Sequence, residues 1–401
     1  MTSVTLRHAG AAAAGLAGGP RFRALPPLSL YIHVPWCVRK CPYCDFNSHE
    51  ARGDVPEAEY VEALIADLDH ALPLVWGRPV YTIFFGGGTP SLLSAQAIET
   101  LLSAVRARVP LAVDAEITLE ANPGTFETAK FAGYRAAGVN RLSIGIQSFD
   151  PRHLKALGRI HDDAQAHRAI EIAREHFDNF NLDLMYALPG QTLAEVGTDI
   201  ARALAYDPPH LSVYHLTIEP NTYFHSHPPV VPDDDAAAEM QDAIEAQLAG
   251  AQYLHYETSA YAKAGKRSRH NLNYWTFGDY LGIGAGAHGK LSFPDRIVRQ
   301  ARYRQPREYM ERIRAGSAVQ TEHDVAAGEI PFEFMMNALR LSEGFALSLF
   351  EERAGMPLVS ALKGLDEAER RGLIVRDHAR VVPTELGRRF LNDLLQIFLP
   401  K

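Results

Sequence analysis

From residue 28 onward, short apolar and β-branched runs alternate with longer stretches in which apolar residues return every three or four positions. Tyr60, Leu64 and Leu68 mark such a face and predict a helix over Glu57–Ala71. A second helix is expected from about Ala95, with Ser94 as its N-cap. The short runs predict strands at Leu30–Val34, Tyr81–Phe85, Ile117–Leu119, Arg141–Ile146, Asn181–Tyr186 and His210–His215.

The six alternations of strand and helix predict an α/β fold with a parallel sheet and right-handed crossovers. An open doubly wound sheet and a barrel both satisfy that order. Polar residues at the ends of the strands favour the barrel, because barrel enzymes gather their sites there. These residues are the cysteines after the first strand, then Gly86–Gly88, Glu120, Gln147, Asp183 and Thr217. Six strands are too few to close a full barrel, so we expect an incomplete (β/α)6 barrel.

The pattern changes near residue 290, and three regions are predicted. Residues 1–27 contain an Ala/Gly run and no acidic residue, and they are expected to form a disordered tail. Residues 28–290 form the core domain. Residues 291–401 are expected to form a small helical, winged-helix-like domain that contains a hairpin at Leu373–Val382. That region is not strongly basic, so a structural or lid role is favoured over DNA binding.

Composition narrows the functional classes. The chain has 401 residues, 47% of them hydrophobic and 22% charged, which is typical of a globular protein. Its net charge of −8 gives no reason to expect nucleic acid as a partner. No apolar run is long enough to span a bilayer. The only three cysteines are Cys37, Cys41 and Cys44, and this cluster indicates a metal or redox site in a reducing compartment.

The spacing of the cysteines allows two kinds of metal site. Three thiolates on one short loop can hold three corners of a [4Fe–4S] cluster and leave one iron free for a cofactor. Alternatively, the thiolates can bind zinc, with His33 or His49 as the fourth ligand.

The flanking residues favour the cluster. The segment Cys37-Val-Arg-Lys-Cys41-Pro-Tyr43-Cys44 resembles the signature of the radical S-adenosylmethionine (SAM) proteins, in which SAM binds the open iron. The triplet Gly86–Gly88 ends the second strand and lets a backbone approach a ligand closely. Its position is similar to that of the superfamily element that holds the amino group of SAM.

The order of motifs from Tyr31 to about Gly289 resembles the anaerobic coproporphyrinogen III dehydrogenases and the related HemW-type haem chaperones. The run Asn181–Thr192 is similar to a hallmark of that group. The resemblance implies contacts with SAM, or with a second small molecule, at Tyr31, Tyr43, Gly87, Gly88, Thr89, Glu120, Gln147, Arg159, Asp183, Thr217 and His288. An ion pair between Arg159 and Asp183 is the structural alternative for those two residues.

Two features separate the branches of this group. The dehydrogenases carry a further cysteine two residues after the third, where this chain has Phe46. The run His270-Asn-Leu-Asn-Tyr274-Trp275 matches a motif of the HemW-type proteins. Histidine can ligate haem iron, and the two aromatic rings can stack on a porphyrin. The alternatives are that the motif only packs at the rim of the barrel, or that His33, His49 or His288 is the haem ligand.

The resemblance therefore implies a cytoplasmic haem chaperone, without dehydrogenase activity, that delivers haem to acceptor haemoproteins. Its expected cofactors are the [4Fe–4S] cluster, SAM and haem. Its expected partners are the acceptors and a haem donor, with transient contact with membrane haemoproteins and a cluster-dependent homodimer. A coproporphyrinogen III dehydrogenase and a non-catalytic zinc scaffold are the alternatives.

Overall fold

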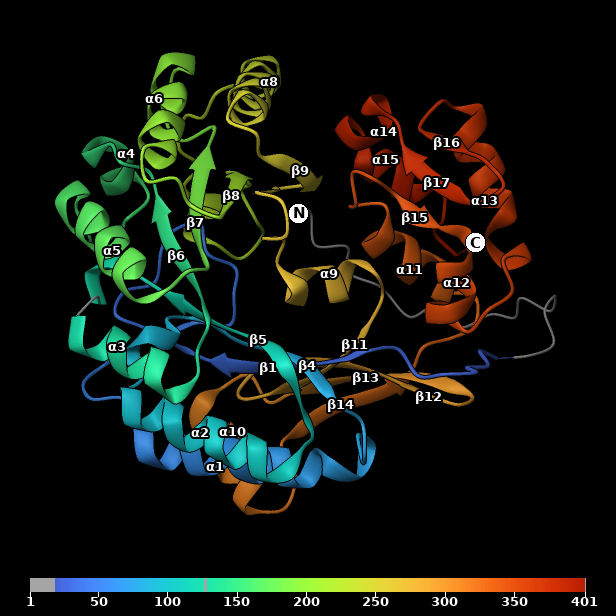
Figure 1. The fold of residues 1–401 in the computed structure, drawn as a ribbon, viewed down its shortest axis with the longest axis horizontal. Helices are drawn as coiled ribbons and strands as arrows, with labels where there is room; N and C mark the ends of the chain where they lie inside the picture. The colour runs from blue at the N-terminus through green and yellow to red at the C-terminus, as the bar shows by residue number, and fades with distance from the viewer. Residues whose placement is uncertain (1–18, 126–127, 401) are drawn as a thin grey trace.

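The computed structural model describes residues 19–125 and 128–400, and its centre is one curved sheet of 12 strands (Figure 1). All six predicted strands occur, in the predicted order and parallel to their neighbours. They are β1 (Leu28–Val34), β4 (Val80–Gly87), β5 (Leu111–Ala121), β6 (Arg141–Gln147), β7 (Phe180–Tyr186) and β8 (His210–His215).

Helices cover the outer face of the parallel strands (Figure 1). The predicted helix at residues 57–71 is α1, and Ser94 caps α2 by accepting a hydrogen bond from the N–H of Ala97 at 3.1 Å. The outer helices are α1 (Glu57–Ala71), α2 (Ala95–Arg108), α3 (Thr128–Ala137), α4 (Pro151–Ala156), α5 (Asp163–His176) and α6 (Leu193–Leu204), with α8 (Asp234–Gly250) packed beside α6. Their apolar faces and the sheet enclose the main hydrophobic core.

The sheet does not close on itself. Its edge strands are β9 (Leu254–Glu257), next to β10 (Ala260–Ala262), and β14 (Val319–Asp324). The expected incomplete barrel is therefore confirmed. The concave side holds helix α9 (Arg269–Trp275) and faces the C-terminal region (Figure 1).

Four strands beside β1 were not predicted. Strand β11 (Asp279–Ile283) pairs in parallel with β1, and β12 (His288–Phe293), β13 (Arg296–Arg302) and β14 continue the sheet in antiparallel order. Helix α10 (Pro306–Arg314) packs on α1. The main sheet thus continues to Asp324, past the predicted division at residue 290, which stays a prediction about domains.

A fully buried ion pair attaches this extension to the rest of the barrel. Nε of Arg302 on β13 lies 3.1 Å from Oδ1 of Asp67 on α1, and both side chains are at most 2% exposed. The same carboxylate accepts hydrogen bonds from the hydroxyl of Tyr309 and the N–H of Gly284. Every oxygen of the buried charge is therefore satisfied, as such a pair requires.

The C-terminal region has its own hydrophobic core, built around Phe334, Phe345 and Phe350. The predicted hairpin is present as β16 (Ile374–Arg376) and β17 (Arg380–Pro383), and β15 (Phe345–Ala346) completes a sheet of three strands. The helices are α11 (Ile330–Ala338), α12 (Leu347–Ala354), α13 (Val359–Arg370), α14 (Glu385–Arg389) and α15 (Leu391–Gln396).

Part of the predicted tail contacts this C-terminal region and the turn between β12 and β13. The N–H of Arg21 donates to the carbonyl of Gly355 at 2.8 Å, and the N–H of Phe22 donates to that of Pro294 at 3.0 Å. The ring of Phe22 packs against the C-terminal core. Residues 1–18 of the predicted tail lie outside the described residues. Within the described part of the chain, no helix is both long and apolar enough to cross a membrane.

Candidate functional site

The carboxyl ends of the parallel strands surround one cavity of about 640 Å³, which we call the barrel cavity. Its wall contains all the predicted site residues except His288. These are Cys37, Cys41, Cys44, Tyr31, Tyr43, Gly87, Gly88, Thr89, Glu120, Gln147, Arg159, Asp183, Thr217, His270, Tyr274 and Trp275. The fold therefore brings the cysteine motif and the His270–Trp275 motif, more than 200 residues apart in the chain, to the same space.

The cysteines lie on the segment that follows β1. Cys37 ends the short strand β2 (Trp36–Cys37), which pairs with β3 (His49–Glu50), and all three thiols are free and half-buried. The amide of Asn47 fixes the end of the loop by donating to the carbonyls of Ala285 and Arg304, each at 2.9 Å. The thiols are thus held at the mouth of the barrel cavity by contacts to the loop after β11 and to the loop before α10.

The three sulfurs are spaced too widely for a preformed zinc site. Bonds of 2.3 Å in a tetrahedral zinc site hold sulfurs about 3.8 Å apart. Among the described residues, no group of three candidate ligands within 4.8 Å of one another includes a cysteine. Burial raises the pKa of Cys37 and of Cys44, so a bound cation is needed to keep these thiols as thiolates. The donor set fits a larger cluster with one thiolate on each of three irons.

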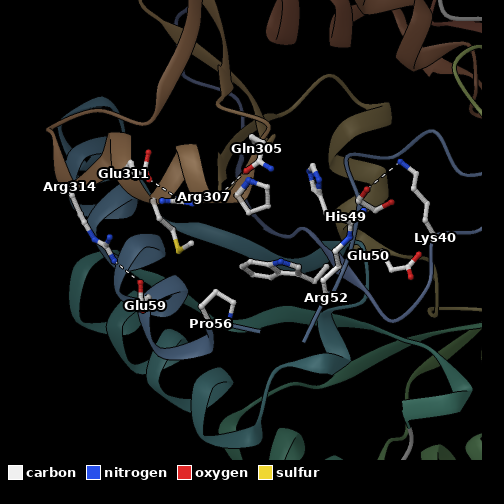
Figure 2. Close-up of a pocket in the computed structure, with 14 residues that line it drawn as sticks. Lys40, His49, Glu50, Arg52, Pro56, Glu59, Gln305, Arg307, Glu311 and Arg314 are labelled. Atoms are coloured by element: carbon white, nitrogen blue, oxygen red, sulfur yellow. Dashed lines mark hydrogen bonds and ion pairs between the residues drawn. The ribbon is translucent and has the colours of Figure 1, made fainter. Parts of the chain in front are cut away.

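The two histidines proposed as zinc ligands have other roles. Nε2 of His33 lies 2.8 Å from the carbonyl of Asn47, to which it must donate. Nδ1 then accepts from the hydroxyl of Tyr31 at 3.0 Å, and burial lowers the pKa of His33 to about 4. Nε2 of His49 lies 3.3 Å from the carbonyl of Arg304, and this histidine lines a surface hollow of about 1020 Å³ between α1 and α10 (Figure 2).

One ion pair joins α10 to α1 at the surface hollow, and a second lies within α10. Arg314 contacts Glu59 at 2.9 Å and Arg307 contacts Glu311 at 3.0 Å (Figure 2). Both pairs are exposed, and such pairs contribute little to stability. Apart from His49, none of the predicted cofactor-binding residues lines this hollow.

The glycine segment at the end of β4 passes directly beside the cysteine segment. The N–H of Gly88 donates to the carbonyl of Val34, and that of Thr89 donates to the carbonyl of Trp36, both at 2.7 Å. A Cβ atom on Gly88 would lie 2.5 Å from the carbonyl oxygen of Trp36. Gly87 has φ of 115°, a conformation that side chains disfavour. Glycine is therefore required here for close approach of two backbone segments at the cavity wall.

Glu120 lies behind this segment. Its Oε2 atom accepts a hydrogen bond from the N–H of Gly87 at 3.2 Å. Burial, and then the neighbouring Asp183, raise the pKa of Glu120 to about 8. The carboxyl group is therefore mostly protonated at neutral pH and becomes a carboxylate when a cationic ligand binds next to it.

Arg159 and Asp183 do not form the ion pair that was considered for them. Arg159 donates to the carbonyl of Gly145 at 2.8 Å, and its Nη1 lies 3.7 Å from Sγ of Cys41. The carboxylate of Asp183 instead accepts from the amide of Asn181 at 2.7 Å and from the hydroxyl of Ser143 at 3.1 Å. Arg159 thus places a positive charge beside the thiol of Cys41.

His270 is buried in the inner wall of the cavity, with 1% of its surface exposed. Its Nδ1 lies 2.7 Å from the hydroxyl of Thr82, which donates to Ser29, so Nδ1 carries the proton. Nε2 then accepts from the hydroxyl of Tyr274 at 3.2 Å. The ring stacks on Phe84 at 4.9 Å, and both ring nitrogens have partners in this conformation.

His288 is the one predicted site residue that does not line the barrel cavity. It begins β12 and pairs with Ala301 on β13. Its contact with SAM stays a prediction. Sequence reasoning also missed residues that line the cavity, among them Arg141, Tyr214, His215 and Asn271.

The comparisons with known proteins agree with this site. Residues 31–203 match the model of the radical SAM superfamily, and residues 325–390 match that of the HemN C-terminal domain. The haem chaperone HemW of Escherichia coli is 53% identical over 379 residues, which cover 94% of this chain and 99% of that protein. The chain belongs to the HemW family.

A second HemW protein, from Haemophilus influenzae, is 47% identical and covers 94% of this chain and 98% of its own. The solved structure of coproporphyrinogen III oxidase (HemN) from E. coli, described as a radical SAM enzyme, superimposes with a TM-score of 0.79. It covers 93% of this chain and 90% of that one at 23% identity, which shows a shared fold. The HemW family and the HemN fold therefore confirm the resemblance and the fold expected from the motifs.

Proposed function

We propose that this protein is a haem chaperone that binds haem in the barrel cavity and delivers it to acceptor haemoproteins. The observation that carries the proposal is that one cavity is lined both by the three cysteines and by the His270–Trp275 motif. The HemW relatives are named haem chaperones, which supports the same function. The alternative dehydrogenase rests on a likeness in fold alone.

In this proposal Cys37, Cys41 and Cys44 hold a [4Fe–4S] cluster whose fourth iron binds SAM. Such a cluster can supply an electron to the sulfonium of SAM. The backbone of Gly87 and Gly88 borders the space beside the cluster and offers polar groups without side chains. Glu120 has its second carboxylate oxygen available for a ribose hydroxyl.

Haem would lie against the aromatic side chains of the motif. Tyr274 and Trp275 both line the barrel cavity, and their rings are 6.4 Å apart. Ligation of iron by His270 requires Nε2 to exchange its hydrogen bond from Tyr274 for the metal, because Nδ1 keeps its proton for Thr82. That tautomer is the one in which histidine binds haem iron through Nε2.

The remaining partners are part of the proposal. Free thiols at the metal site support a reducing compartment such as the cytoplasm. The haem acceptors, a haem donor, transient contact with membrane haemoproteins and a cluster-dependent homodimer are predictions.

The direct test is haem transfer. Protein reconstituted anaerobically with iron and sulfide should bind haem stoichiometrically and pass it to an apo-haemoprotein, as followed by the visible spectrum of the acceptor. Trp275→Leu should weaken haem binding, whereas Trp76→Leu, at an exposed tryptophan far from the cavity wall, should not. Absence of haem binding by the reconstituted protein would contradict the proposal.

Two further results would decide for the alternatives. Incubation with reductant, SAM and coproporphyrinogen III should leave the tetrapyrrole unchanged, and formation of protoporphyrinogen IX would assign the chain to the dehydrogenases. A colourless reconstituted protein that contains zinc and no iron would support the scaffold. Cys41→Ser should abolish the brown colour of the cluster without unfolding the chain.

A further inference from the structure

Arg141 is a buried cation whose guanidinium group has no hydrogen-bond or ion-pair partner among the described residues. It begins β6, is 2% exposed, and lines the barrel cavity together with Ser143, Gly145 and Gln147, the other residues on its face of the strand. In the described part of the chain, no hydrogen bond or ion pair joins its guanidinium group to another residue, and Nε is fully buried. Buried arginines are normally paired, because an unpaired charge out of water is costly.

The polar neighbours of Arg141 are already engaged with one another. Its positive charge adds to burial in lowering the pKa of His210 and of His270, which places it close to both. The nitrogens of His210 bond Asn181 at 2.6 Å and Tyr256 at 2.8 Å. Asp183 accepts from Asn181 and Ser143. Burial raises the pKa of Asp183, and the nearby charge of Arg141 opposes that shift. No hydrogen bond or ion pair joins the two groups, however, so among the described residues Arg141 has no directly bonded counter-ion.

A second unpartnered donor lies next to Arg141. Thr118 on β5 is the residue paired with Arg141 in the sheet register, and its side chain is fully buried. Its hydroxyl has no hydrogen-bond partner among the described residues. Thr118 lies two positions before Glu120, so the two side chains share the face of β5 that points into the cavity. A guanidinium and a hydroxyl side by side suit the two oxygens of a carboxylate.

The pair lies deeper in the barrel than the predicted SAM contacts, with Thr118 two residues, or about 7 Å along β5, from Glu120. Arg141 and Gln147 are at opposite ends of the seven-residue strand β6, roughly 20 Å apart. Gly87, Gly88 and Glu120 lie toward the ends of their strands, beside the cysteines. The methionyl carboxylate of SAM would sit at the cluster, and a ligand that reaches Arg141 must extend to the inner end of the cavity.

We propose that Arg141 and Thr118 form a carboxylate-binding subsite at the inner end of the barrel cavity, which takes a propionate of the bound haem. This inference rests on the proposed function as a haem chaperone. The guanidinium supplies two parallel N–H groups and the threonine hydroxyl a third donor. The propionate supplies a directly bonded carboxylate, which Arg141 does not have among the described residues, so this subsite orients the porphyrin with one propionate edge inward.

The test compares haem with its dimethyl ester, in which both carboxylates are masked, by anaerobic absorbance titration of the full-length protein. The wild type should bind haem roughly tenfold more tightly than the ester. Arg141→Met should lose that preference, through weaker haem binding with unchanged ester binding. Arg141→Lys should keep part of the preference for haem over the ester, and Thr118→Val should reduce this preference less than Arg141→Met does. Arg267→Met removes an arginine that is paired with Glu343 outside the cavity, and it should behave as wild type.

The possible outcomes distinguish failure of the proposed subsite from failure of the proposed haem-chaperone function. Equal binding of haem and ester by the wild type, or an unchanged preference in Arg141→Met, would overturn the subsite and leave the chaperone function standing. No binding of either ligand by the wild type would overturn both. Should Arg141→Met fail to fold, Arg141→Lys and Thr118→Val decide by the same ratio of affinities.

The carboxylate of SAM is the other source of the same chemistry. Equilibrium binding of SAM to the cluster-loaded protein should be equal in wild type and Arg141→Met. A selective loss of SAM binding, with the preference for haem over its ester intact, would assign the subsite to SAM and overturn the haem assignment.

Discussion

The Nδ1 atom of His270 lies 2.7 Å from the hydroxyl of Thr82 and so joins helix α9 to strand β4. His270→Ala removes this bond and the one from Tyr274, and leaves a void beside Phe84. We expect the free energy of unfolding of the cofactor-free protein to fall by about 2–4 kcal/mol in urea titrations. His323→Ala, at an exposed position on β14, should change it by less than about 0.5 kcal/mol.

Thr82→Val tests the same bond from its other side. If the two residues act through one hydrogen bond, the double variant should be less destabilised than the sum of the single variants, by about 1 kcal/mol. Strict additivity would show that the bond does not contribute. The cycle also matters for haem, because loss of haem binding in His270→Ala alone would not distinguish a ligand from a residue that positions α9.

Glu120 should make the cofactor-free protein less stable as the pH rises. Its pKa is about 8 in the folded chain and near 4.5 when unfolded, so the folded state holds the extra proton between those values. The contribution of Glu120 to the free energy of unfolding is complete below pH 4.5. It is lost as the pH rises toward 8, by about 1.4 kcal/mol per pH unit. Glu120→Gln should remove this slope in urea titrations, whereas Glu175→Gln, at an exposed helix position, should leave it.

Gly88→Ala should separate the glycine segment from the cysteine segment. The new Cβ would meet the backbone of Trp36 at 2.5 Å, which only a backbone shift can relieve. We expect a loss of about 1–3 kcal/mol in unfolding free energy and weaker SAM binding by the reconstituted protein. Gly328→Ala, where a Cβ meets nothing within 4 Å, is the matched control. Wild-type behaviour of both variants would show that the close approach has no role.

The buried pair Asp67–Arg302 should contribute far more than a surface pair on the same helix. Arg302→Met leaves the Asp67 carboxylate buried without its cation, and about 3–5 kcal/mol of unfolding free energy should be lost. Asp69 also lies on α1 and pairs with Arg108 at the surface. Arg108→Met should cost less than about 1 kcal/mol. Similar losses in the two variants would contradict the assigned burial.

The sequence predicted the elements whose signals are local. The six parallel strands and helices α1 and α2 follow from periodicity and from one capping residue, Ser94. Strand β11 was missed because it joins the sheet by pairing with β1, a contact between distant parts of the chain. Its surroundings are rich in glycine, at Gly278, Gly282, Gly284 and Gly286, and resemble a loop.

The site residues also fall into those that the sequence could predict and those that only the fold shows. The cysteines and the glycine triplet carry a motif, and so they could be named from the sequence. Arg141 could not, because an arginine at the start of a strand is usually an exposed residue and only the fold shows that it points inward. The suggested ion pair between Arg159 and Asp183 is absent for a similar reason. Ser143 and Asn181 donate hydrogen bonds to the carboxylate of Asp183, and only the fold shows that they lie next to it.

The position of β1 in the sheet has a consequence for synthesis of the chain. Leu28 pairs with Asp279 on β11, about 250 residues later. At a usual elongation rate of about 5–20 residues per second, one edge of this apolar strand stays unpaired for on the order of 10–50 s after β1 emerges from the ribosome. An unpaired apolar edge is a template for aggregation. The newly made chain is therefore open to aggregation through this edge until β11 has been synthesised and paired.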